Sequence, residues 1–296
     1  GSICRRTSRR RREKGFAMLQ NSIAVSPVAG AIGAEIAGVD LSQDLSDETV
    51  GTIRRALLDH LVVFFRDQEL SPDRFMAFAR RFGEPVAYPF VKGLDGYPEI
   101  TPILKREEDR NNFGGIWHSD TTYQQVPPMG TILYGIDIPP YGGDTEFANQ
   151  YLAYEALSEP MRRFLDGLTA VNISGKGRVQ QTRTDMLKHS SVGMKGDELV
   201  SRHPVVRTHP ETGRKALYVN VAHTTHFEGM TEDESQPILE FLFQHQIRAE
   251  FTCRFRWSPG AVAFWDNRCT QHNPINDYHG FRRLMHRITL GGDEPA

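Results

Sequence analysis

Hydrophobic residues recur at helical spacing in several segments of this 296-residue chain. Behind Ser46, which is a good N-cap, two acidic residues and a stripe of apolar residues predict a helix. A Ser-Pro start, an aromatic stripe and a closing glycine predict a second helix over 71–83. A capping box formed by Thr231 and Glu234 predicts a third helix over 232–247. The apolar stripes are expected to pack against a core.

Other segments have the continuous or alternating hydrophobic pattern of β-strands. Residues 61–65 (LVVFF) and 130–138 (GTILYGIDI) are apolar runs next to turn residues, and several more such runs follow towards the C-terminus. Residues 22–38 predict short strands interrupted by glycine and proline. We therefore expect a mostly β fold with flanking helices. Residues 84–116 should be loop-rich, with the charged run KREEDRNN at 105–112 exposed to solvent.

Charge is unevenly distributed along the chain. With 39% hydrophobic and 24% charged residues and a formal net charge of -2, the composition is that of an ordinary enzyme, not of a nucleic-acid-binding or membrane-spanning protein. Residues 1–17 hold seven Arg or Lys and one Glu, a charge of +6, so the remainder carries -2 - 6 = -8. This basic leader could be an import presequence, a polybasic contact or sequence upstream of a true start at Met18, and we expect it to be disordered.

Behind the leader, we expect residues 18–296 to form a single domain. The polar, glycine-containing segment at 174–198 has few apolar anchors, which predicts an insertion that acts as a lid. The 3 cysteines have no spacing typical of a metal site or a disulfide framework. This favours a reducing, cytoplasmic setting.

The candidate chemistry begins with the sequence His118-Ser-Asp120 and with His272, far downstream. Residues i and i+2 of a strand point to the same side, so His118 and Asp120 can face one metal if this segment is extended. Two imidazoles and a carboxylate make the facial triad of non-heme Fe(II) oxygenases, which leaves coordination positions open. A structural zinc site would use four protein ligands instead.

Two arginines follow His272 on what should be one strand face, Arg283 and Arg287. A guanidinium with a hydroxyl beside it suits a carboxylate, so Arg283 and Thr145 are candidates for binding the far end of a keto acid that chelates the iron. Arg287 could then select an anionic substrate, or it could form a structural salt bridge.

With these candidate residues, the sequence resembles the Fe(II)/2-oxoglutarate-dependent dioxygenases that include taurine dioxygenase and 2,4-dichlorophenoxyacetate dioxygenase. The resemblance extends from near Val39 to the C-terminus. Five stretches carry it, and the last one is the most specific. These are WHSDTTY (117–123), PPYGGDTEFAN (139–149), YEALS (154–158), HPVVRTHPETGRKALYVN (203–220) and WDNRCTQHNPINDYHGFRRLMHRITL (265–290).

The resemblance implies a double-stranded β-helix, which is a cupin-like jelly roll, and a role for each matching residue. His118, Asp120 and His272 would hold Fe(II), while Thr145 and Arg283 would bind 2-oxoglutarate. Arg287 would meet the anionic group of the prime substrate, and the further candidates for substrate contacts are Tyr88, Thr121, Tyr123 and His223. By analogy with the family, we expect a homodimer or homotetramer.

The implied reaction consumes O2 and 2-oxoglutarate, releases succinate and CO2, and hydroxylates a small anionic substrate, with cleavage where the carbon bears a heteroatom. Sulfonates, alkyl sulfates and aryloxy or carboxylic acids are the candidates. Taurine is not expected, because Phe113-Gly-Gly-Ile116 stands where taurine enzymes carry polar residues. Two alternatives stay open: a non-catalytic protein that binds a metal or a small acid, and a hydrolytic zinc enzyme, in which Arg283 would have no task.

Overall fold

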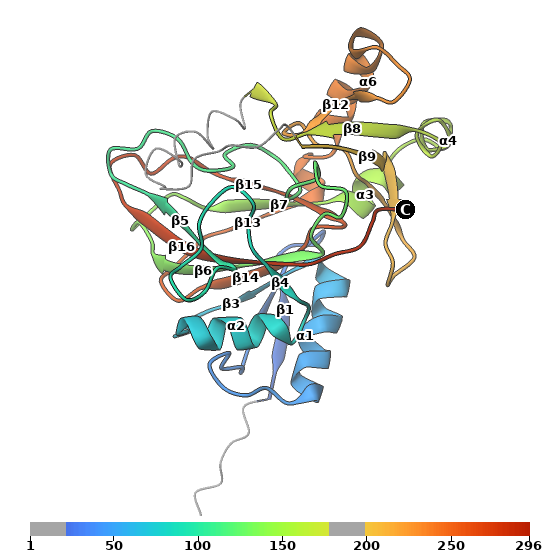
Figure 1. Cartoon of the computed structure of the whole chain (residues 1–296). Helices are drawn as coiled ribbons and strands as arrows, with labels where there is room; N and C mark the ends of the chain where they lie inside the picture. The colour runs from blue at the N-terminus through green and yellow to red at the C-terminus, as the bar shows by residue number, and fades with distance from the viewer. Residues whose placement is uncertain (1–21, 178–198) are drawn as a thin grey trace, which may run out of the picture.

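The computed structural model describes residues 22–177 and 199–296. The leader at 1–17 and most of the insertion near 174–198 lie outside these residues, so the predictions made for them stay untested. Within the described part, the chain is mostly β, as predicted, with a few helices around the sheets (Figure 1).

The largest sheet has 8 strands in the order β1-β2-β3-β14-β6-β16-β4, and β5 pairs with β16 beside this path. Its strands are β1 (Ala24–Pro27), β2 (Ala34–Ala37), β3 (Val62–Phe65), β4 (Pro85–Val86), β5 (Ile100–Lys105), β6 (Gly130–Asp137), β14 (Val262–Asp266) and β16 (Arg283–Leu290). Most of its pairs are antiparallel, and β2 with β3 is parallel.

Smaller sheets complete the β-structure. A 3-stranded sheet in the order β13-β7-β15 consists of β13 (Thr252–Phe255), β7 (Thr145–Asn149) and β15 (Thr270–Pro274). A second one, in the order β12-β8-β9, consists of β12 (Thr224–Phe227), β8 (Thr169–Ile173) and β9 (Val200–Pro204). The 2-stranded sheet pairs β10 (Val206–Thr208) with β11 (Lys215–Leu217).

The helices begin where the caps predict. Ser46, Ser71 and Thr231 each accept a backbone hydrogen bond as N-cap, and Thr231 forms the full capping box with Glu234. Residues 150–155 and 159–165 form two short helices. The helices are α1 (Asp47–His60), α2 (Pro72–Arg80), α3 (Gln150–Glu155), α4 (Glu159–Leu165), α6 (Glu232–His245) and the 3-10 turn η1 (Ala249–Phe251).

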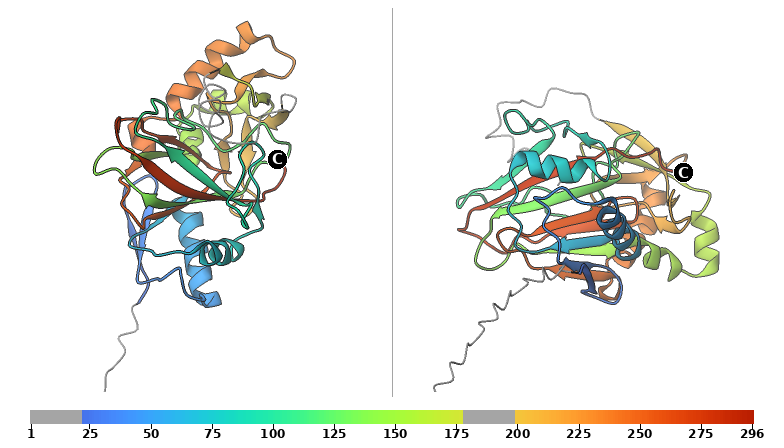
Figure 2. Two further views of the ribbon diagram at one scale, coloured as in Figure 1. Left: turned by 60° about the vertical axis from the view of Figure 1, so that its left-hand side comes forward. Right: turned by 90° about the horizontal axis from the view of Figure 1, so that it is seen from below.

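Strand β3 shows why its sequence is apolar throughout. Val63 and Phe65 pack in the core beneath α1 and α2, which cover one face of the main sheet (Figures 1 and 2). Val62 and Phe64 point to the other face and pack against residues of the β13-β7-β15 sheet such as Phe147. Because both faces are covered, each residue of this strand is buried.

Three expectations need correction. The second predicted helix, α2, ends at Arg80 and not at Gly83. Residues 84–116 also contain the strands β4 and β5. The proline in β5 weakens its strand pattern, but a proline is tolerated in a strand that pairs on one side only. The run 105–112 is not exposed throughout, since Lys105 and Asn112 at its two ends are buried.

Candidate active site

The three predicted metal ligands converge, although they come from two distant parts of the chain. Nε2 of His118 lies 3.6 Å from Oδ1 of Asp120, and Nε2 of His272 lies 3.9 Å from the same oxygen. One potential ligand atom from each of the three side chains lies within 4.8 Å of the others. The arrangement is compact enough for all three to bind one ion.

Backbone pairing brings the two histidines together. His118 N donates to His272 O at 3.1 Å and His272 N donates to His118 O at 2.8 Å, an isolated antiparallel bridge between the 118 segment and β15. Within 118–120, strand pairing is therefore confined to His118, and the segment is not a regular strand. It turns directly afterwards, where Thr121 has a φ of 46°, a rare left-handed conformation for a β-branched residue.

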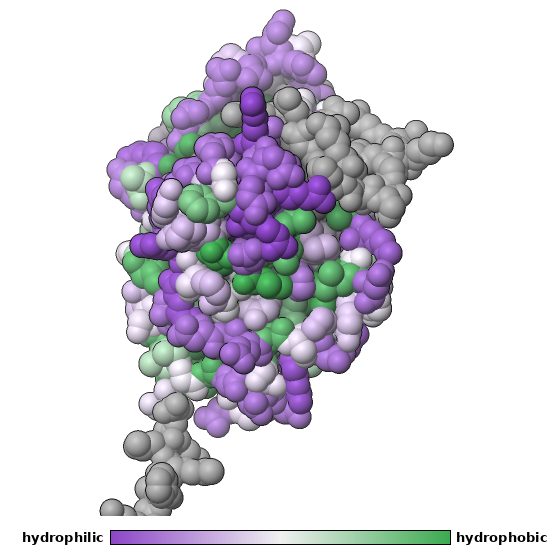
Figure 3. All heavy atoms as spheres, turned by 90° about the vertical axis from the view of Figure 1, so that its left-hand side faces the viewer, coloured by the Kyte–Doolittle hydropathy of each residue, from purple (hydrophilic) through white to green (hydrophobic). Residues whose placement is uncertain are grey.

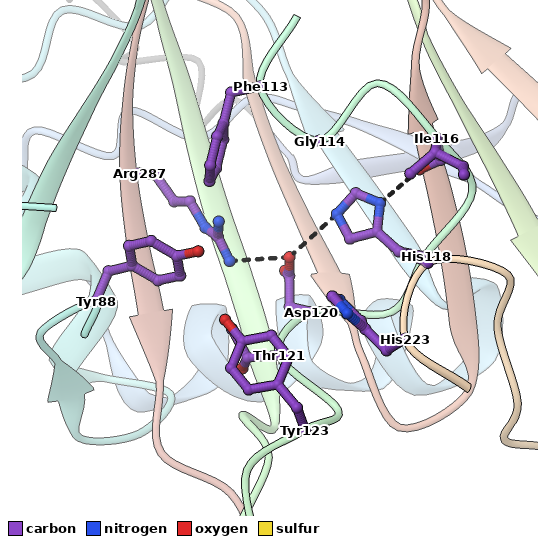
Figure 4. Close-up of a pocket in the computed structure, with 11 residues that line it drawn as sticks. Tyr88, Phe113, Gly114, Ile116, His118, Asp120, Thr121, Tyr123, His223 and Arg287 are labelled. Atoms are coloured by element: carbon purple, nitrogen blue, oxygen red, sulfur yellow. Dashed lines mark hydrogen bonds and ion pairs between the residues drawn. The ribbon is translucent and has the colours of Figure 1, made fainter. Parts of the chain in front are cut away.

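Hydrogen bonding and burial prepare the imidazoles to act as ligands. Nδ1 of His118 lies 2.6 Å from Ile116 O; since the carbonyl can only accept, Nδ1 carries a proton, and Nε2 is the ring nitrogen left to bind a metal (Figure 4). Burial, with His118 adding to the effect, holds the pKa of His272 well below its usual range, so this ring is neutral. Gly114 lies close to the same site, and a Cβ there would come within 3.1 Å of His118 Cε1.

The carboxylate of Asp120 is held by a buried network. Its Oδ2 accepts a hydrogen bond of 2.7 Å from Thr131, whose hydroxyl accepts one of 2.9 Å from Asn267 Nδ2. Asn267 Oδ1 in turn accepts from Trp265 Nε1 at 2.9 Å. Because Thr131 occupies Oδ2, Oδ1 is the oxygen that faces the histidines. This network was not expected from the sequence, although Trp265 and Asn267 stand in a stretch that carries the family resemblance.

Arg287 is the nearest cation to this carboxylate. Its Nη2 lies 2.9 Å from Asp120 Oδ1, an ion pair without the alignment of a hydrogen bond. Burial raises the pKa of Asp120, but Arg287 and the two histidines more than offset this, so its pKa lies well below the usual range. Asp120 is therefore a carboxylate, the form that binds a metal.

A narrow pocket opens beside the three side chains, and all the predicted substrate contacts line it (Figure 4). The cavity is small, with a volume of about 30 Å³, so lining side chains must move to admit an organic substrate. Arg287 is the one arginine or lysine among its described lining residues, and its guanidinium lies 5.4 Å from the centre of the Tyr88 ring. The complete lining is Tyr88, Phe113, Gly114, Ile116, His118, Asp120, Thr121, Tyr123, Ala222, His223 and Arg287.

Arg283 and Thr145 meet around a third residue, Trp257, which the sequence did not single out. Trp257 Nε1 donates a hydrogen bond of 2.9 Å to Thr145 Oγ1, and the Arg283 guanidinium lies 5.8 Å from the indole centre. Because the threonine oxygen accepts from the indole, its own proton is directed elsewhere and can be donated to an anion. Arg283 is buried, and its Nε and Nη2 have no hydrogen-bond partner in the described part of the chain.

The donor set of two imidazoles and one carboxylate belongs to the 2-His-1-carboxylate class of metal sites, which is typical of non-heme iron oxygenases. The residues fit a divalent ion, because the carboxylate is ionised and the imidazole nitrogens face it. A second group of potential ligands, His209 with Asp266 and Cys269, lies elsewhere in the described residues. That second group does not suit a metal, because Asp266 already accepts hydrogen bonds from Arg268 and lies 3.0 Å from His209 Nε2.

Known proteins agree with this class. Residues 24–289 match the family model described as taurine catabolism dioxygenase TauD, TfdA family. The chain is 39% identical to an alpha-ketoglutarate-dependent sulfate ester dioxygenase of Pseudomonas putida, over 92% of this chain and 90% of that protein. It is also 39% identical to an alkylsulfatase of Acinetobacter baylyi, over 90% of this chain and 84% of that protein.

A solved structure has the same fold. The crystal structure of a taurine dioxygenase from Burkholderia xenovorans superimposes with a TM-score of 0.80 at 42% identity, covering 93% of this chain and 91% of that one. The chain therefore belongs to the TauD, TfdA family of dioxygenases. The predicted reaction class is confirmed: it is an oxidoreductase that uses Fe(II), O2 and 2-oxoglutarate, the compound also called alpha-ketoglutarate. The roles of single residues stay predictions.

Proposed function

We propose that this protein oxidises an alkyl sulfate ester at the carbon next to the ester oxygen. The observation that carries the proposal is the pocket beside Asp120, in which Arg287 is accompanied mainly by aromatic and aliphatic side chains such as Phe113 and Ile116. One cation suits the single charge of a sulfate monoester, and the apolar lining suits an alkyl chain. The sulfate-ester relatives support the same class.

In this proposal His118, Asp120 and His272 hold Fe(II), and Thr145 with Arg283 binds the far carboxylate of 2-oxoglutarate. When bound, the iron supplies the redox chemistry that couples O2 and the keto acid to attack on a C–H bond. The main sheet and the β13-β7-β15 sheet form the walls of the predicted jelly roll, with the metal ligands between them. Trp257 and Thr131 act as positioning residues, since each fixes the direction of a polar group in the site.

The overall reaction balances without a further reductant. The ester R–CH2–O–SO3⁻, O2 and 2-oxoglutarate give the hydroxylated ester, succinate and CO2. The new hydroxyl loses its proton as the C–O bond to sulfate breaks, which leaves an aldehyde, sulfate and a proton. Arg287 would hold the sulfate while the adjacent CH2 lies at the metal side of the pocket, and Tyr88, Tyr123 and His223 would enclose the rest of the substrate.

Arg287 can serve the substrate although it contacts Asp120, because a divalent ion held by Asp120 would take over the charge compensation of that carboxylate. The guanidinium is then left with an uncompensated charge at the pocket wall. A substrate anion restores the balance, so metal and substrate should favour each other's binding.

The experiment is a comparison of hexyl sulfate, hexane sulfonate, taurine and a phenoxyacetate in assays of succinate and sulfate release. We expect hexyl sulfate to give succinate and sulfate in equal amounts, and taurine to give neither above the background without substrate. Faster turnover of the sulfonate or the aryloxy acid would contradict the choice of ester. Binding of 2-oxoglutarate with no succinate from any of these acids would favour the non-catalytic alternative.

A further inference from the structure

Lys105, the last residue of β5, is buried at the edge of a charged run. Its exposed fraction is 5%, whereas Glu107 and Glu108 directly after it are exposed. Nζ has no hydrogen-bond partner among the described residues. Figure 3 looks onto the side of the molecule where β5 and β16 lie in Figure 1, and both hydrophilic and hydrophobic residues lie on this face.

The strand register places Lys105 directly opposite Arg283. The two residues are Cα partners in the antiparallel pair of β5 and β16, so their side chains leave the sheet on the same face. Arg283 is also buried, with Nε and Nη2 lacking partners in the described ranges. Two buried cations on neighbouring strands thus share one site.

Both charges lie against the same aromatic ring. Lys105 Nζ is 4.4 Å from the centre of the Tyr278 ring, and the Arg283 guanidinium is 5.7 Å from it. The Tyr278 hydroxyl donates its proton to Asn112 Oδ1 at 2.5 Å, so it is a neutral group that can offer Arg283 only a lone pair. The ring can attract both cations, but it does not neutralise either.

The carboxylates near this site have other partners. Asp144 forms its ion pair with Arg254 at 2.7 Å, and Asp109 accepts a hydrogen bond of 2.8 Å from Arg106 N. Within the described ranges, no salt bridge reaches Lys105 or Arg283. Asp109 acts on Lys105 and Asp144 on Arg283 only through their charges, and neither forms an ion pair with these cations. Two buried positive charges without an ion pair are unfavourable, so the site suits an anion that arrives from outside.

We propose that Lys105 is a second cationic ligand, beside Arg283, for the far carboxylate of 2-oxoglutarate. The inference rests on the proposed role of Arg283 and adds a residue that determines which keto acid is accepted. A keto acid without the far carboxylate would leave two buried charges unpaired, and such mismatches discriminate strongly. In the absence of the ligand, burial lowers the pKa of Lys105; Asp109 partly opposes this effect, and the nearby Arg283 adds to it.

The test compares two keto acids of equal chain length, 2-oxoglutarate and 2-oxopentanoate, which lacks the far carboxylate. Binding to the anaerobic Fe(II)-loaded protein is measured by calorimetry for wild type, Lys105→Met and Lys105→Arg. Since a hydrogen bond to a charged group contributes about 1.5–3 kcal/mol, Lys105→Met should weaken 2-oxoglutarate roughly tenfold or more. The affinity for 2-oxopentanoate should change less than about twofold, because that acid never reaches the lysine.

Lys105→Arg keeps the charge and should retain most of the 2-oxoglutarate affinity. Lys92→Met is the matched control, since Lys92 is an exposed lysine paired with Asp95. If Lys105→Met weakens both acids equally, or neither, the lysine is structural and the inference is overturned. If wild type itself fails to bind 2-oxoglutarate, the proposed function fails instead. Should Lys105→Met not fold, the same comparison is made with Lys105→Gln.

Discussion

Nη2 of Arg287 lies 2.9 Å from Oδ1 of Asp120, the carboxylate oxygen that also faces both imidazoles. The other oxygen of Asp120 is taken by Thr131. The proposed metal ion and the proposed substrate-binding arginine would therefore both interact with Asp120 Oδ1. If these roles hold, this single ion pair links the binding of the anionic substrate to the metal site.

The first prediction concerns Arg287→Met. Loss of a guanidinium that binds the substrate anion should raise KM for hexyl sulfate by roughly tenfold to a hundredfold, from the strength of charge-assisted hydrogen bonds. The release of succinate without substrate should persist, because 2-oxoglutarate does not depend on this residue. Kinetics with and without hexyl sulfate check both parts.

Arg282→Met is the matched control, because Arg282 is an exposed arginine close by in the sequence that pairs with Asp137. It should leave KM unchanged. If Arg287→Met abolishes binding of 2-oxoglutarate while KM for the ester is unaltered, the assignment of the two buried arginines is reversed.

The second prediction concerns Thr131→Val, which removes the donor to Asp120 Oδ2 without changing the size of the side chain. Partners of a ligating carboxylate typically affect metal affinity 10- to 100-fold, so we expect weaker Fe(II) binding of roughly this size. Titration with Co(II) under equilibrium conditions measures it directly. Thr131→Ser keeps the hydroxyl and should bind Co(II) nearly as wild type does. If Thr131→Val binds Co(II) as tightly as wild type, the network behind Asp120 does not support metal binding.

The third prediction concerns stability. Asp266 is buried and lies 3.0 Å from His209 Nε2, and it accepts hydrogen bonds of 2.9 and 2.7 Å from Arg268. Breaking a buried ionic network by removing one partner is costly, so Asp266→Asn should lower the free energy of unfolding by about 3 kcal/mol. Urea unfolding measures the loss. Glu159→Gln, which removes an exposed pair with Arg163, should change little, and an equally small effect at Asp266 would argue against the network.

The fourth prediction is a pH dependence. The pKa of Lys105 lies below the usual 10.5, chiefly because of burial. A far carboxylate binds the protonated lysine, so affinity for 2-oxoglutarate should be full below the lowered pKa and fall as the pH rises through it. Calorimetry from about pH 7 to about pH 10 would follow this loss. Lys105→Arg should remove the dependence, because arginine keeps its proton over that range.

Local signals in the sequence predicted the helices well. The caps at Ser46, Ser71 and Thr231 have a defined chemistry that acts within one turn, and each begins a helix in the structure. Strand β5 was missed because its stability comes from pairing with β16, which is distant in the sequence and leaves no local periodicity in a segment with a proline. Residues 1–17 and most of 174–198 lie outside the described part of the chain, so their predictions stand as such, and so do those of a cytoplasmic setting and a homo-oligomer.

The three converging side chains were predictable because residue type and the order along the chain already restrict them to one kind of metal site. The network behind Asp120 and the burial of Lys105 were not, since both depend on which strands become neighbours. A lysine in a charged run is normally solvated, and only its register opposite Arg283 distinguishes it. In the described residues, no helix is long and apolar enough to cross a membrane.

The central claim is that His118, Asp120 and His272 together hold an iron ion to which 2-oxoglutarate binds. The most direct measurement is visible absorption of the anaerobic protein with Fe(II), before and after 2-oxoglutarate is added. We predict a charge-transfer band in wild type that is absent in His272→Ala. No band in wild type at saturating 2-oxoglutarate, or an undiminished band in His272→Ala, would contradict the account.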